Sequence, residues 1–150
     1  MVKDDATQIA RLTVFLRIYG VLSLLLFGWL LVGFAVRAPA LAEGGSLHWM
    51  LWNDLQCGNE PCHVPPMLLI IYVTWGVFFF LAARQPLAYV SFLNFTMWAN
   101  LLHGLLMGVQ TVGMMDHYWI KWLTDIPYCL ILALGVYLWR PNANRAIGAQ

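Results

Sequence analysis

The chain has 150 residues, of which 61% are hydrophobic and only 10% are charged. Ordinary soluble domains carry roughly a quarter charged residues, so this composition excludes that class and indicates an integral membrane protein. The formal net charge of +1 excludes a basic surface for nucleic acid.

Four apolar runs divide the chain, and their lengths of 17 to 26 residues suit helices that cross a bilayer, which need roughly 20 residues. They cover residues 12–36, 67–83, 87–112 and 118–139. We therefore expect an all-α fold: a four-helix transmembrane bundle with up-down-up-down connectivity, in one membrane domain formed by residues 1–150. The first run is too long for the apolar core of a usual signal peptide, so we expect an uncleaved anchor.

The loop between the first two runs, residues 37–66, is the only long one in this scheme. Aromatic and polar residues alternate over Ser46–Leu55, a pattern that predicts a short helix lying at the membrane interface. Cys57 and Cys62 follow this segment, close enough along the chain for a disulfide.

Cationic residues concentrate on the side of the predicted bundle that holds both termini. They are Lys3, Arg11, Arg84, Arg140 and Arg145. By the positive-inside rule the termini are cytoplasmic, and we expect the protein in a bacterial inner membrane. The loop with the two cysteines is then extracytoplasmic and oxidising, which favours a Cys57–Cys62 disulfide.

The extracytoplasmic loops also carry side chains that suit copper or zinc. Beside the two cysteines they are His48, His63, Asp116 and His117, with Met114 and Met115 next to the last two. Their spacing matches no standard metal site, so metal binding is an alternative and the disulfide is the expectation. A haem held by two histidines is disfavoured, because only His103 lies deep in a predicted span.

One face of the third run collects four polar side chains and a methionine. With successive residues turned by about 100°, these five lie within an arc of about 100° that also includes Thr111. They are Thr96, Asn100, His103, Met107 and Gln110. Polar groups turn away from lipid, so this arc should face the bundle. Gly104 and Gly108 beside it form a small-xxx-small pair that lets another helix approach closely.

The fourth run carries two charges at depth, Lys121 and Asp125, which share one face of a continuous helix. We expect Pro127 to kink this helix. Counting about 1.5 Å per residue from the connecting loop places His103 and Asp125 at one level, so we expect a hydrogen bond or ion pair between them. This polar seam acts either as glue between helices or in chemistry.

Several motifs in the second half of the chain resemble one known family. They are LAARQPLA over Leu81–Ala88, Trp98 ahead of His103, Met107 and Gln110 after it, and Asp125-Ile126-Pro127. Over about Met67–Pro141 the chain is similar to a family of small bacterial four-helix membrane proteins known only as a domain of unknown function. The resemblance implies four spans and no assigned activity.

We expect a non-enzymatic accessory or binding subunit that docks to a larger membrane complex or holds an apolar ligand. Its partners are then the bilayer and other membrane subunits or a second copy, and the sequence indicates no particular cofactor. It contains no nucleophile–base set, phosphate loop or dinucleotide motif. One alternative is an oligomeric proton-coupled carrier or channel using His103 and Asp125, since histidine titrates near neutral pH. Another is extracytoplasmic binding of copper or zinc.

Overall fold

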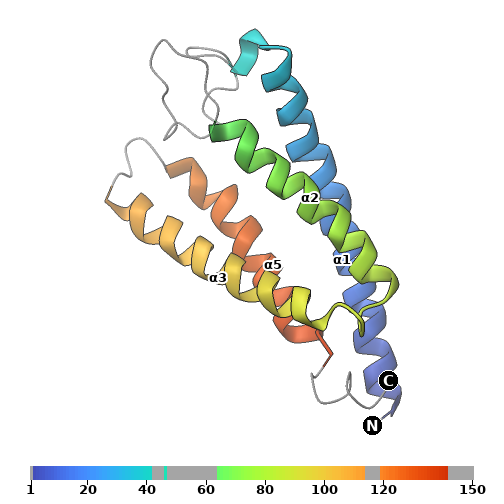
Figure 1. Ribbon diagram of the computed structural model, residues 1–150. Coiled ribbons are helices and arrows are strands. Elements are labelled where there is room, and N and C mark those ends of the chain that lie inside the picture. Colours follow the sequence, from blue (N-terminus) through green and yellow to red (C-terminus); the bar gives the residue numbers. More distant parts are fainter. Residues whose placement is uncertain (1, 42–45, 47–63, 114–118, 142–150) are drawn as a thin grey trace. The chain divides into compact units, whose positions relative to one another are not determined.

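The computed structural model describes residues 2–41, 46, 64–113 and 119–141, and every regular element in these ranges is a helix (Figure 1). The elements are α1 (Val2–Ala35), the 3₁₀ turn η1 (Pro39–Leu41), α2 (Val64–Arg84), α3 (Val90–Val112), the 3₁₀ turn η4 (Trp119–Trp122) and α5 (Asp125–Trp139). The short interfacial helix predicted after Ser46 falls outside the described residues.

Within the described ranges, four segments are long and apolar enough to cross a membrane. They are Ala6–Ala35, Pro66–Arg84, Val90–Val112 and Trp119–Trp139. The all-α fold with four spans is therefore confirmed, and the chain is a multi-pass membrane protein.

The first helix is much longer than its apolar run. It begins at Val2, whereas the run begins at Leu12. A helix of 34 residues extends about 50 Å, while the hydrocarbon core of a bilayer is about 30 Å thick. Hydropathy marks only the part that lipid surrounds, but helical hydrogen bonding continues through the polar residues before it. The N-terminal turns of α1 therefore extend beyond the hydrocarbon core.

The fourth span is two pieces, where the sequence predicts one kinked helix. Its first piece is η4, and α5 begins afresh at Asp125, with Pro127 as its third residue. The first N–H groups of a helix have no partner in that helix, so a proline in the first turn costs no hydrogen bond. Because of this break, Lys121 and Asp125 do not lie on one continuous helix face.

The chain forms two compact units, which we describe separately: Tyr19–Phe79, and Met1–Ile18 together with Phe80–Gln150. In the first, the second half of α1 packs against α2. Phe27 stacks on Tyr72 with ring centroids 4.5 Å apart. A β-carbon at Gly76 would lie 3.0 Å from that of Ser23. Aromatic stacking and a small residue thus hold these two helices together.

In the second unit, α3 and α5 run antiparallel and side by side (Figure 1). Met107 of α3 packs in one buried cluster with Ile126 and Cys129 of α5. The first half of α1 joins this pair through Phe15, whose ring lies against Gly135 so closely that a β-carbon there would come within 3.0 Å of three ring carbons. Only glycine leaves room for the Phe15 ring at this position.

Candidate functional site

The α3–α5 pair contains most of the polar residues predicted to matter, and its register follows from two contacts. A β-carbon built on Gly104 would lie 2.9 Å from Leu130 Cδ2. Towards the other end of the pair, the guanidinium of Arg140 donates a hydrogen bond to the side-chain oxygen of Asn94. Both contacts match the same antiparallel alignment of the two helices.

This alignment separates the levels of His103 and Asp125. It places Asp125 opposite Val109, six residues after His103, which corresponds to about 9 Å along the helix axis. His103 and Asp125 therefore lie at different levels, where one common level was expected. The count from the loop treated the residues before Asp125 as one α-helix, whereas η4 is a 3₁₀ turn and α5 begins afresh at Asp125, so the count does not give the depth of Asp125. A direct His103–Asp125 pair stays a prediction.

Electrostatic neighbours nevertheless gather at this end of the pair. Lys121 of η4 is close enough to His103 for its positive charge to act on the imidazole. Asp125 is likewise close enough to act on the thiol of the buried Cys129. The three titratable residues predicted for the seam therefore belong to the α3–η4–α5 region, although they come from three different elements.

The structure divides the five seam residues of α3 into two groups. Thr96, Asn100 and Met107 are buried, with 0%, 3% and 8% of their surface exposed. His103 and Gln110 are exposed. We expected the whole arc to face the bundle, but His103 and Gln110 do not.

Close packing at one glycine explains this division. Helices associate in lipid mainly through close van der Waals contact at small residues. Gly104 makes that contact with Leu130 and Cys129, whereas a β-carbon at Gly108 would meet Trp122 only at an ordinary 3.7 Å. The covered face of α3 is therefore centred on Gly104 and Asn100, and the edge of the polar arc is left outside.

Asn100 makes its hydrogen bond within its own helix. Its amide nitrogen donates to the carbonyl oxygen of Thr96 at 2.9 Å. Among the described residues no hydrogen bond runs from Asn100 to α5, so it does not act there as the glue between helices that the sequence allows. Its burial is a cost of the close approach at Gly104, and the packing of apolar groups must offset that cost.

The opposite end of the pair is closed by a contact that the sequence did not indicate. Asn94 accepts the hydrogen bond from Arg140, and the Arg140 guanidinium carbon also lies 6.0 Å from the centre of the Tyr137 ring. In the sequence, Arg140 reads only as a charge that ends the last span, and Asn94 lies outside the polar arc. Only the antiparallel alignment of α3 and α5 brings the two together.

We expect Asn94→Leu and Arg140→Gln each to lower the free energy of unfolding in detergent by about 1 kcal/mol, since hydrogen bonds to charged groups stabilise by about 1.5–3 kcal/mol and this one is only partly buried. The measurement is a double-mutant cycle by denaturant titration, with an expected coupling of about 1 kcal/mol. Arg84→Gln is the control, because Arg84 is exposed, and its effect should add to that of Asn94→Leu. Additive losses for the Asn94–Arg140 pair itself would contradict the contact.

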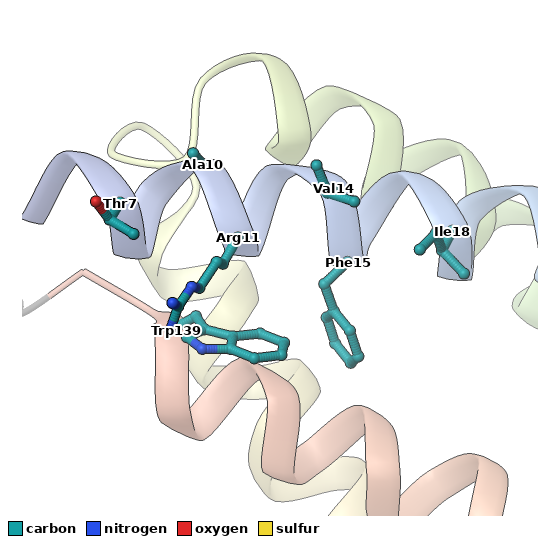
Figure 2. A pocket seen from close by; sticks show the side chains of 7 residues that line it. All are labelled: Thr7, Ala10, Arg11, Val14, Phe15, Ile18 and Trp139. Carbon is teal, nitrogen blue, oxygen red and sulfur yellow. The ribbon is translucent and has the colours of Figure 1, made fainter.

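A groove of about 440 Å³ runs along the first half of α1 beside the end of α5 (Figure 2). It is lined by Thr7, Ala10, Arg11, Val14, Phe15, Ile18 and Trp139. Phe15 and Trp139 meet edge to face, with ring centroids 5.2 Å apart and an angle of 71° between the rings. Sequence reasoning used Arg11 only for membrane orientation, because no local pattern links it to a tryptophan so far along the chain.

The remaining predicted site residues lie outside the described part of the chain. They are His48, Cys57, Cys62, His63, Asp116 and His117. The disulfide and the metal alternative therefore stay predictions. Within the described ranges no three histidine, cysteine or acidic side chains come together.

Comparison with known proteins gives a family and no activity. The family of unknown function DUF6632 matches residues 6–144. This range extends well beyond the resemblance over Met67–Pro141 and includes the cysteine loop and the α1 side of the groove. No curated protein and no solved structure matches the chain. Since the match covers nearly the whole length, the chain belongs to the DUF6632 family of unknown function.

Proposed function

We propose that the protein is a non-enzymatic accessory subunit that docks to another membrane protein through one face of α3. This face consists of His103, Leu106 and Gln110, which we name the α3 stripe. Leu106 is 56% exposed, and the two polar residues are exposed as well. The spacing of three and four residues puts all three on one side of the helix, in the pattern by which helices pair side by side.

The exposure of His103 is the observation that carries this proposal. Within α3 it lies about 14 Å from Val112 and about 20 Å from Val90, which is hydrocarbon depth for a membrane-spanning helix. An ionisable side chain at that depth is costly in lipid and is found facing protein or water. A neighbouring transmembrane helix would cover the exposed imidazole and shield it from lipid.

Gln110 supports the same partner. Its amide both donates and accepts hydrogen bonds, and it lies two helical turns from His103 on the same face. Polar contacts between membrane helices contribute roughly 0.6–2 kcal/mol each. Two such contacts along one helix would favour a specific partner over lipid.

The orientation in the membrane belongs to this proposal. Arg11 lies beside Trp139 at the end of α5, and Arg140 follows Trp139 in the sequence. Arg84 is the last residue of α2. This concentration of arginines supports cytoplasmic termini under the positive-inside rule. The proton-carrier alternative receives less support, because the observed alignment puts His103 and Asp125 on different levels.

The test is photocrosslinking in native membranes from a benzophenone amino acid placed at Leu106. We expect a cross-linked species that contains a second protein chain, and its yield should fall at least severalfold when His103→Leu is added. The matched control is the same probe at Leu134. This side chain has nearly the same exposed fraction, 55%, but it belongs to α5 and lies outside the α3 stripe. Cross-links confined to one chain, or equal yields from both positions, would overturn the proposal.

A further inference from the structure

We propose that the groove beside Trp139 binds one anionic phospholipid, with its phosphate at Arg11 and an acyl chain along Val14 and Ile18. This site is separate from the α3 stripe and would stand if docking through that stripe were disproved. The groove is formed only by residues of the unit that contains the first half of α1 and all of α5.

The polarity of the groove matches that of a lipid molecule. Thr7, Arg11, Val14 and Ile18 follow one another at helical spacing along one face of α1, with the polar pair first and the apolar pair after it (Figure 2). From Thr7 to Ile18 the helix rises about 16 Å, roughly half the hydrocarbon thickness and therefore one leaflet. The groove thus leads from head-group depth down to acyl-chain depth.

The groove also holds a cation available for an anionic group. Arg11 is exposed, and among the described side chains none forms a hydrogen bond or ion pair with it. The neighbouring Arg140 already donates to Asn94. Asp125, the acidic residue whose side chain the structure describes, lies at the opposite end of α5. A guanidinium that has no carboxylate partner among the described side chains is well suited to the oxygens of a phosphate.

The aromatic residues fix the depth of this site. Tryptophan is enriched at the membrane interface, and Trp139 ends the last span beside Arg11. Its contact with Phe15 forms an apolar surface that an acyl chain can cover. The volume of about 440 Å³ lies in the range of small-molecule sites, and a basic pocket at a membrane surface is a setting in which lipid head groups bind. Charge and polarity together favour a lipid over an uncharged helix of a second copy.

The experiment is native mass spectrometry of the full chain released from nanodiscs that contain equal amounts of phosphatidylglycerol and phosphatidylcholine. We expect retention of one phosphatidylglycerol, in preference to phosphatidylcholine. Arg11→Gln should reduce that preference about fivefold, the effect of one cation near an anionic surface. Arg84→Gln, an exposed arginine outside the groove, should leave the preference unchanged. Millimolar inorganic phosphate should not displace the lipid, because phosphate lacks the acyl chain.

A second variant tests the apolar part of the groove. Ala10→Trp would fill the groove from an exposed position, so it should reduce retention of both lipids several-fold while the melting temperature in detergent stays the same. The proposal is overturned if the unchanged protein retains both lipids equally, or if Arg84→Gln lowers the preference as much as Arg11→Gln. It is equally overturned if Ala10→Trp leaves lipid retention unaffected or if phosphate alone displaces the lipid.

Discussion

Replacing Gly104 with leucine is expected to separate α3 from α5 and to lower the free energy of unfolding by about 3 kcal/mol, the upper part of the usual range for overpacking. The reason is direct: even a β-carbon at this position would lie 2.9 Å from Leu130 Cδ2 and 3.3 Å from Cys129 Cβ. A full leucine side chain has no space there. Forcing the helices apart would also loosen the cluster of Met107 with Ile126 and Cys129. Denaturant titration in detergent measures the loss.

Gly108→Leu is the matched control for this prediction. The two glycines form one sequence motif, but among the described residues a β-carbon at Gly108 would meet only Trp122, at an ordinary contact distance of 3.7 Å. We expect a change below about 1 kcal/mol, because leucine also has the higher helix propensity. If both replacements destabilise equally, the two helices approach each other along the whole motif and not only at Gly104.

Replacing Asn100 with aspartate is expected to destabilise the protein by about 3 kcal/mol, close to the cost of placing an acidic residue at the centre of a membrane helix. Only 3% of Asn100 is exposed, and it lies near the middle of α3. The amide can donate to the Thr96 carbonyl, whereas a carboxylate cannot donate at all. A charged group without donors in this position is strongly disfavoured. The measurement is again unfolding in detergent, at neutral pH.

Asn100→Leu is the comparison variant, because leucine is similar in size to asparagine but has no polar group. The Thr96 carbonyl keeps its backbone hydrogen bond when the amide is lost, so no buried acceptor is left without a partner. We therefore expect the leucine variant to be as stable as the parent protein or more stable by about 1 kcal/mol. A large loss with leucine would mean that the amide binds something outside the described chain, and the search for a ligand should then begin at Asn100.

The fold class could be predicted from the sequence because lipid imposes a strict requirement on the backbone. Without water to bond the peptide groups, an apolar run of about 20 residues must become a helix, and four runs give four spans. The ends of the helices were harder to predict. Val2 starts α1 because helices continue into water, and Asp125 starts α5 because Pro127 fits best in a first turn.

The face that each helix presents to its neighbour was decided only in the tertiary structure. Periodicity groups His103 and Gln110 with Asn100, but it does not say where the covered face ends. Contact between Gly104 and Leu130 sets that limit, and it leaves His103 outside. The same antiparallel alignment joins Asn94 to Arg140. Sequence by itself determined the membrane spans through hydropathy, a local property, whereas the register and rotation of the helices depend on which small residues meet across the chain.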